Sequence, residues 1–220
     1  MAFGRCVLDH THSCLKTRPM KRLILASASK RRYDILKNVG YSFDVVVSNV
    51  DEDSVKENTP HELVQKLSRL KALAVLCRDE VCDGSVVLAS DTVVELDGTI
   101  LGKPTDKKDA ARMLESLSAR THNVYTGVCI IDAASRREIC FYEKCIVHMS
   151  KISPDQIHEY IETGQPMDKA GSYGIQGPGA LFVSQIEGDF FTVSGLPVNR
   201  VYGELRSFGV LPRMGDVEYL

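Results

Sequence analysis

The sequence lacks several features that would each assign it to a whole class of proteins. No apolar run approaches the roughly 20 residues needed to span a bilayer. The net charge is only -2 at pH 7, so nothing indicates a broad attraction to nucleic acid or acidic membranes. The first nineteen residues contain no apolar segment, and we therefore expect no secretory signal. Internal repeats, low-complexity tracts and interior linkers are also missing.

Familiar catalytic and metal-binding motifs are missing as well. The chain has no Walker A sequence, no His-Glu-x-x-His pair and no evident Ser-His-Asp order. Its seven cysteines are odd in number and scattered, which is typical of a reducing compartment, so we expect a cytoplasmic protein. Cys77/Cys82 and Cys140/Cys145 reach the outer limit of zinc-ligand spacing. An offset of five on one strand places Cys140 and Cys145 on opposite faces, which disfavours a zinc site.

What is present fits a folded α/β protein. A chain of 220 residues with 44% hydrophobic residues can bury a sizeable core, as one large domain or two closely joined lobes. A strand signal follows Met20 at once, so we predict a folded domain over 20–220 and a poorly ordered extension over 1–19.

The chain is organised around a strand-to-helix turn at residues 23–32. An apolar strand there leads into small hydroxyl residues, then Arg31 and Arg32, and a helix predicted to stop at Gly40. A helix N-terminus offers unpaired N–H groups and a favourable dipole to an anion, and guanidinium groups can fork onto phosphate oxygens. A capped helix start with two solvated arginines fits the same pattern.

A lysine falls within the apolar stripe of the next predicted helix. Thr59, Pro60 and Glu62 form a helix start, and the helix is predicted to run to about Arg78. Lys71 either packs its stem and extends its ammonium to water, or points into a cleft and meets an anion. The predicted stripe around it comprises Leu63, Val64, Leu67, Leu70, Ala74 and Cys77.

An aspartate lies in the middle of the strongest strand signal, residues 86–94. The segment is nearly all apolar, which predicts a central strand covered on both faces. Burying an unpaired carboxylate is costly, so Asp91 needs a cation, a metal or hydrogen-bond donors. A bulge or a salt bridge would also explain it, but we favour a metal or base role.

Three further polar segments are candidates for the same site. An acidic loop at 48–53 follows a predicted strand at 41–47, where α/β proteins tend to place ligand-contacting groups. Lys103 ends a predicted hairpin, and Gln176 lies in a glycine-dense loop at 169–179, where its amide could contact a base edge. Each segment could equally be ordinary surface structure.

The remaining patterns predict a framework of helices and strands. Cations around a phosphate chain, with carboxylates holding a divalent metal, are what phosphoryl chemistry needs. The predicted framework comprises a helix over 109–117, paired strands over 123–132 and 138–150, a helix from 153 to 164, strands over 180–187 and 190–194, and a last helix ending near 209.

Eight short blocks in a fixed order carry a resemblance to a known family. They are Leu-Ala-Ser-Ala-Ser-Lys-Arg-Arg (25–32), Asp-Glu (51–52), Lys-Ala (71–72), Ser-Asp-Thr-Val-Val (90–94), Gly-Lys-Pro (102–104), His-Asn-Val-Tyr-Thr-Gly (122–127), Lys-Ala-Gly-Ser-Tyr-Gly-Ile-Gln-Gly (169–177) and Gly-Leu-Pro-Val (195–198). Together they resemble the Maf family of nucleoside triphosphate pyrophosphatases over nearly everything from Lys21 to about Phe208.

The resemblance implies hydrolysis of a nucleoside triphosphate between the α and β phosphates, with Mg²⁺ or Mn²⁺. It implies two lobes of mixed sheet with flanking helices and a central cleft, as in the inosine triphosphate pyrophosphatases, and a homodimer. Asp91 matches the family's catalytic carboxylate, as metal-bound base or as pure metal ligand, with Glu52 beside it at the metal. The matches on the substrate side are Ser27, Arg31, Arg32, Lys71, Thr92, Lys103 and Gln176.

The family has a dTTP/UTP branch and a 7-methyl-GTP branch. The second tends to carry Trp in place of Arg31 and Glu in place of Gln176, so this chain resembles the first. A glutamine amide can pair with a pyrimidine carbonyl and imide N–H. Two alternatives stay open: a pyrophosphatase for inosine or modified purine triphosphates, and a non-enzymatic nucleotide-binding regulator of cell division. The order of preference among dTTP, UTP, CTP and modified pyrimidines stays open too.

Overall fold

The protein is built on one mixed sheet of seven strands. The computed structural model describes residues 21–213 and 215, so the extension expected at 1–19 lies outside the described residues. The strand order is β2-β1-β3-β5-β6-β7, and β4 pairs with β3 beside this path. β1 is parallel to β2 and β3, and the other pairs are antiparallel. The strands are β1 (Arg22–Leu25), β2 (Phe43–Val45), β3 (Ser85–Leu96), β4 (Thr99–Leu101), β5 (Thr121–Asp132), β6 (Glu138–Met149) and β7 (Val183–Glu187).

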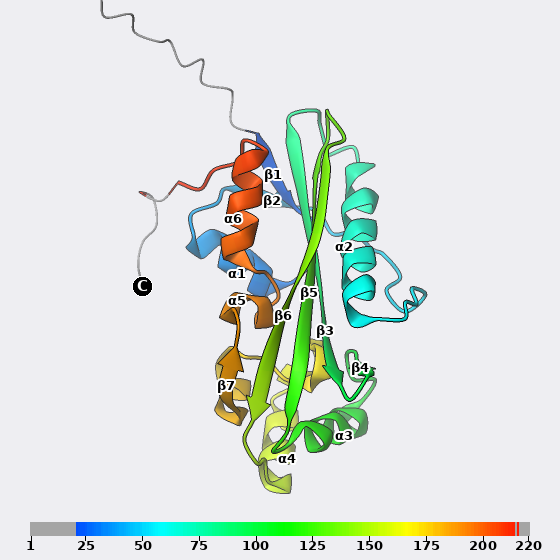
Figure 1. The fold of residues 1–220 in the computed structure, drawn as a ribbon, viewed down its shortest axis with the longest axis vertical. Coiled ribbons are helices and arrows are strands. Elements are labelled where there is room, and N and C mark those ends of the chain that lie inside the picture. The colour runs from blue at the N-terminus through cyan, green and yellow to red at the C-terminus, as the bar shows by residue number, and fades with distance from the viewer. Residues whose placement is uncertain (1–20, 214, 216–220) are drawn as a thin grey trace, which may run out of the picture.

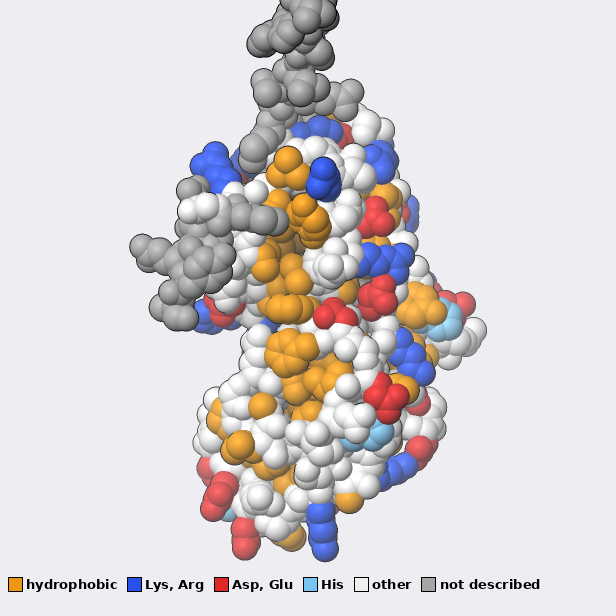
Figure 2. Space-filling model, turned by 60° about the vertical axis from the view of Figure 1, so that its left-hand side comes forward, with side chains coloured by type: hydrophobic (Ala, Val, Ile, Leu, Met, Phe, Trp, Pro, Cys, Tyr) orange, Lys and Arg blue, Asp and Glu red, His pale blue; other side chains and the backbone are white. Residues whose placement is uncertain are grey.

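Three long central strands join two lobes. β3, β5 and β6 run the length of the molecule; β1, β2 and most helices of the first lobe lie at one end, and β4, α3, α4 and β7 lie at the other (Figure 1). Figure 2 shows the molecule narrowing between the lobes. The helices are α1 (Lys30–Asn38), α2 (Pro60–Leu76), α3 (Lys107–Leu117), α4 (Pro154–Glu162), α5 (Phe190–Val193) and α6 (Val198–Ser207), with 3-10 turns η1 (Gln165–Asp168), η2 (Ala170–Ser172) and η3 (Gly177–Phe182).

The buried core follows this division. One apolar cluster fills the second lobe around Leu114 and Tyr160. Two others lie in the first lobe, one around Leu36 and Leu205 with α1 and α6, and one around Val75 with α2. The predicted α/β fold with a two-lobed mixed sheet and flanking helices is confirmed. No helix of the described segment is long and apolar enough to cross a bilayer.

The sheet contains a gap in strand pairing where the lobes meet. On one side of β3, β1 is paired only as far as Leu88, and β4 begins only at Val94. The opposite edge of β3 pairs with β5 throughout. Residues 89–93 therefore present an edge to which no described strand is paired, and Asp91 lies in the middle of it.

Several predicted elements change type or length in the structure. The predicted strand at 190–194 is wrong, because this segment forms helix α5: Asp189 caps it by accepting hydrogen bonds from the backbone N–H groups of Phe191 and Thr192. Local capping thus overrides a strand-prone composition. The strand predicted from residue 180 begins at Val183, after η3, and β2 is shorter than the predicted 41–47.

The buried face of α2 is rotated from the predicted stripe. Val64 and Leu67 are buried as expected, but Leu63, Leu70 and Ala74 are only partly buried and Cys77 is exposed. The full buried set is Val64, Leu67, Ser68, Lys71, Ala72, Val75 and Leu76. A prediction from hydrophobicity alone misplaced the buried face of α2, because the polar residues Ser68 and Lys71 lie on that face.

Candidate active site

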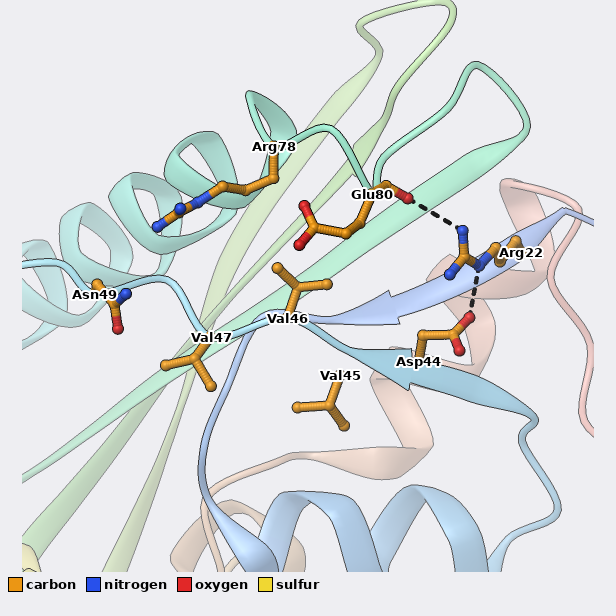
Figure 3. Close-up of a pocket in the computed structure, with 8 residues that line it drawn as sticks. All are labelled: Arg22, Asp44, Val45, Val46, Val47, Asn49, Arg78 and Glu80. Carbon is orange, nitrogen blue, oxygen red and sulfur yellow. Dashed lines mark hydrogen bonds and ion pairs between the residues drawn. The ribbon is translucent and has the colours of Figure 1, made fainter.

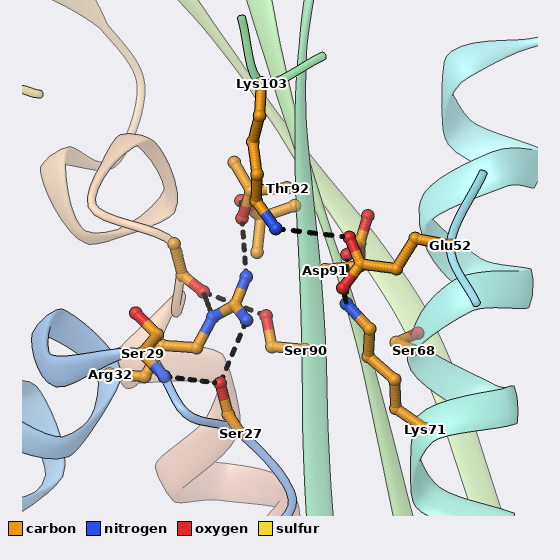
Figure 4. A network of polar contacts seen from close by, with 12 residues as sticks. Ser27, Ser29, Arg32, Glu52, Ser68, Lys71, Ser90, Asp91, Thr92 and Lys103 are labelled. Atoms are coloured by element: carbon orange, nitrogen blue, oxygen red, sulfur yellow. Dashed lines mark hydrogen bonds and ion pairs between the residues drawn. The ribbon is translucent and has the colours of Figure 1, made fainter. Parts of the chain in front are cut away.

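A buried ion pair lies at the gap in the sheet. Lys71 of α2 donates from Nζ to Asp91 Oδ1 of β3 at 2.5 Å, and the two residues are only 6% and 4% exposed. Lys71 Nζ also lies 2.8 Å from Glu52 Oε1 (Figure 4). Of the two alternatives for Lys71, the structure supports the one in which its ammonium points inward and meets an anion. For Asp91 the structure shows the salt-bridge alternative, with Lys71 as the cation, and the metal or base role stays a prediction.

The pair forms here because α2 approaches the sheet unusually closely. Asp91 is in register with Gly127 of β5. A Cβ at Gly127 would lie 2.3 Å from the Val64 carbonyl oxygen of α2, which is closer than real Cβ contacts allow. A glycine opposite Asp91 therefore permits the backbone contact that brings Lys71, two turns further along the helix, to the carboxylate.

Glu52 joins the pair to a second lysine. Its Oε2 lies 3.6 Å from Nζ of Lys103, which is mostly exposed after β4. Burial by itself would raise the pKa of Glu52, but the hydrogen bond and charge of Lys71 and the charges of Lys103 and Arg32 together lower it. Glu52 is therefore held ionised, and the acidic loop predicted to contact a ligand lies in the site.

Arg32 forms a second network at the start of α1. It donates from Nε to the Gly195 carbonyl at 2.9 Å, and from Nη1 and Nη2 to the hydroxyls of Ser27 and Thr92, each at 3.2 Å (Figure 4). Burial lowers its pKa, whereas the charges of Asp91 and Glu52 act in the opposite direction. All three acceptors are neutral, so the positive charge of Arg32 remains available to a ligand.

Supporting residues of this network were not assigned roles from the sequence. The Gly195 carbonyl also accepts from the Ser90 hydroxyl at 2.8 Å. Thr126 lies 2.9 Å from the Thr92 hydroxyl and donates to the Thr192 carbonyl. Gly195 has φ +102, and a Cβ there would lie 3.3 Å from Thr92 Oγ1. Ser90, Thr126 and Gly195 occur in the quoted sequence blocks, but their contacts join segments 34 to 105 residues apart, which meet only in the fold.

Two of the predicted site residues make no hydrogen bond to either network. Arg31 forms none with the described residues; burial lowers its pKa, the charge of Asp168 in the second lobe acts in the opposite direction, and the charge of Arg31 in turn lowers the pKa of Arg32. Gln176 is exposed at the start of η3 and forms no hydrogen bond or ion pair with either network. The Tyr160 hydroxyl accepts from the Gly174 N–H, two residues before Gln176. Arg31 thus belongs to the first lobe, whereas the loop that carries Gln176 packs on Tyr160 of the second lobe.

The donor set is compatible with a hard divalent cation. Asp91 uses Oδ1 for Lys71, and its Oδ2 accepts no hydrogen bond from the described residues. Glu52 Oε2 has only the long contact to Lys103. Magnesium is commonly bound through one or two carboxylates together with substrate phosphates. Asp91 and Glu52 fit that requirement.

A separate hollow lies beyond β2, away from these networks. It has a volume of about 400 Å³ and is lined in part by Val46, Arg78, Asp44 and Arg22 (Figure 3). Arg22 pairs with Asp44 at 2.5 Å and donates to the Glu80 carbonyl. It contains none of the residues predicted for the site, and its own charges neutralise one another.

Fold and site together define an α/β protein with a buried lysine–carboxylate cluster and an arginine anchor at a gap in the sheet. The family model described as Maf-like protein matches residues 22–208, and the chain belongs to this family. The resemblance seen in the sequence blocks is thereby confirmed.

Curated relatives extend over most of the chain. The dTTP/UTP pyrophosphatase of Symbiobacterium thermophilum is 45% identical over 190 residues, covering 86% of this chain and 95% of that protein. The dTTP/UTP pyrophosphatase of Bacillus pumilus is 45% identical over 193 residues, covering 88% and 100%. A solved structure of the Staphylococcus aureus Ham1 protein matches 59% of this chain and 72% of its own at 16% identity and a TM-score of 0.38, too distant to indicate function.

Proposed function

We propose that the protein hydrolyses dTTP, UTP and related or modified pyrimidine nucleoside triphosphates to the monophosphate and pyrophosphate, as part of nucleotide-pool cleaning. Relatives at 45% identity carry the name dTTP/UTP pyrophosphatase. The single structural observation behind the proposal is the buried Lys71–Asp91 pair, with Glu52 2.8 Å from the same ammonium. Such a cluster is expensive to bury without a task that uses its charges.

The cations of the site suit a triphosphate. Arg32 is oriented by neutral acceptors and would bind phosphate oxygens with its remaining N–H groups. Lys103 extends from the segment after β4, and its exposed ammonium could bind the oxygens of the leaving pyrophosphate. The first turn of α1 adds unpaired backbone N–H groups. Together these groups would stabilise negative charge that develops in the transition state.

Asp91 would orient the attacking water and accept its proton at Oδ2. Lys71 keeps the carboxylate in place through Oδ1. Mg²⁺ or Mn²⁺ bound by Asp91 and Glu52 would supply Lewis-acid polarisation and ease deprotonation of water. In the alternative, Asp91 serves only as a metal ligand. Either role uses the oxygen that the described residues leave free.

Substrate choice is proposed to depend on Arg31, Thr92 and Gln176. Arg31 follows the strand-to-helix turn next to Arg32, and Gln176 is exposed at the start of η3, so both side chains would be accessible to the base of a bound nucleotide. The amide of Gln176 offers a donor and an acceptor, which matches the pyrimidine imide edge.

The test is a panel of nucleotides in the presence of Mg²⁺, with pyrophosphate and monophosphate measured separately. We expect dTTP and UTP to be cleaved fastest, with pyrophosphate rather than phosphate released. Faster cleavage of inosine or modified purine triphosphates would replace the pyrimidine assignment. Nucleotide binding without any pyrophosphate release would favour a non-enzymatic regulator.

We further propose a homodimer that acts in the cytoplasm. Apolar side chains gather along one face of the molecule (Figure 2), and large exposed hydrophobic residues include Leu181, Phe190 and Tyr142. The five cysteines of the described segment are free thiols, which suits a reducing compartment. Light scattering of the purified chain measures the assembly.

A further inference from the structure

Two cysteines and a glutamate converge on one face of the sheet, outside the proposed active site. Cys129 of β5 is in direct register with Cys140 of β6. Glu138 lies two residues before Cys140 on the same strand, so both side chains are on one face. The two Sγ atoms and a Glu138 oxygen all lie within 4.8 Å of one another. Strand register thus pairs Cys140 with a cysteine that the sequence spacing did not suggest.

The distance between the Cys140 and Glu138 ligand atoms fits a tetrahedral thiolate site. Cys140 Sγ lies 3.3 Å from Glu138 Oε1. Bonds of about 2.3 Å to sulfur and about 2.0 Å to oxygen at tetrahedral angles place those two ligand atoms about 3.5 Å apart. The cluster therefore needs only small side-chain movements to surround one ion.

The charges around the cluster are also suitable. Two thiolates, one carboxylate and a divalent ion leave a net charge of -1, which Arg69 of α2 offsets. Arg69 donates to Glu138 through Nε at 2.6 Å and Nη2 at 3.2 Å.

We propose that Cys129, Cys140 and Glu138 form a binding site for a thiophilic divalent cation such as Zn²⁺, with a water completing the tetrahedron. On binding, each S–H bond is exchanged for an S–metal bond, and the two protons pass to the solvent. Cys129 is fully buried and Cys140 is partly exposed, so the ion enters from the Cys140 side. The site links β5 to β6 beneath α2 and does not depend on the proposed function.

Cobalt substitution tests the site by the absorption of thiolate-bound ions. The reduced full chain, in which Cys6→Ser, Cys14→Ser, Cys77→Ser and Cys82→Ser remove four other thiols, is titrated anaerobically with Co²⁺. We expect one equivalent to give sulfur-to-cobalt charge-transfer and tetrahedral visible bands that Zn²⁺ displaces. Cys140→Ser should weaken Zn²⁺ binding by about a hundredfold or more, and Glu138→Gln by about tenfold.

Two matched variants separate this site from other thiols and carboxylates. Cys145→Ser removes a buried thiol that instead donates to the Asp189 carbonyl, and should leave the bands unchanged. Glu52→Gln alters the proposed active-site metal position and should leave them unchanged as well. Absence of the bands in the parent chain, or their persistence in Cys140→Ser, would overturn the proposal. If Cys140→Ser fails to fold, the surface-accessible Glu138→Gln provides the same decision.

Discussion

The two networks of the candidate site each contain one buried or half-buried cation, but they differ in whether the protein neutralises its charge. On α2, the cation Lys71 faces two carboxylates, so its charge is neutralised within the protein, and Asp91 Oδ2 accepts no hydrogen bond from the described residues. On α1, the cation Arg32 faces a carbonyl and two hydroxyls, so its charge is retained. Because Asp91 and Thr92 are adjacent on β3, they point to opposite faces and separate the two networks. One network is suited to a metal and a water, and the other to a phosphate.

Removing the carboxylate is the most severe way to break this division. Asp91→Asn keeps the shape but removes the charge that faces Lys71, and we expect kcat for dTTP to fall about a hundredfold or more. Steady-state pyrophosphate release measures the effect. Asp97→Asn, at an exposed turn of the same hairpin, is the matched control and should retain activity. Near-normal turnover of Asp91→Asn would exclude Asp91 as the general base.

Replacing Arg32 by lysine tests whether the second network needs the several N–H donors of a guanidinium as well as its positive charge. Arg32→Lys keeps the charge but cannot donate to Gly195, Ser27 and Thr92 together. We expect kcat/KM to fall by about tenfold to a hundredfold, with binding of free pyrophosphate weakened in parallel. Calorimetry with pyrophosphate separates this loss from misfolding. Unchanged pyrophosphate affinity would remove Arg32 from the phosphate site.

Moving the helix tests the first network without touching its charges. Gly127→Ala places a methyl group against the α2 backbone, so α2 must shift and Lys71 must withdraw from Asp91. We expect a loss of about 1–3 kcal/mol in the free energy of unfolding and a fall of about tenfold in kcat. Gly203→Ala in α6, where a Cβ meets no atom within 4 Å, is the control and should cost neither. Normal kcat in Gly127→Ala would show that the close packing does not position the pair.

A substitution at Gln176 tests whether substrate choice depends on a residue outside both networks. Gln176→Glu presents a carboxylate to the imide edge, and we expect kcat/KM for dTTP and UTP to fall by about tenfold. Guanine nucleotides should lose less, because their edge is rich in donors. Gln165→Glu provides a matched substitution at the start of η1. An unchanged ratio of pyrimidine to guanine nucleotide cleavage would contradict the role of Gln176.

The smallest expected effect is a shift in pH dependence. Lys71 and Lys103 lower the pKa of Glu52, so Glu52 stays ionised below the usual glutamate range, and activity should persist there. Lys103→Met removes one of these charges, so the pKa should rise and the acidic limb of the kcat/KM profile should move upward by less than about one pH unit. Lys108→Met, on the exposed side of α3, is the control and should not move that limb. A limb that stays in place, or moves downward, in Lys103→Met would contradict the coupling.

Much of the framework and the choice of site residues followed from local sequence. Apolar strand patterns and helix-capping residues predicted β3, the β5–β6 pair, α3 and α4 correctly, because each of these signals is contained within a few neighbouring residues. The inward lysine and the buried aspartate were each recognisable alone, because a charge in an apolar pattern needs an explanation.

Their partners were decided by the tertiary structure. Lys71 meets Asp91 because Gly127 lets α2 approach the sheet, Arg32 is oriented by a carbonyl 163 residues away, and Cys140 faces Cys129 through strand register. Sequence by itself determined which residues carry charge and where most of the strands and helices lie, although the local cap at Asp189 that makes 190–193 a helix was missed. Only the folded chain decided which charges meet, because ion pairs and hydrogen bonds depend on distances that chain order does not specify.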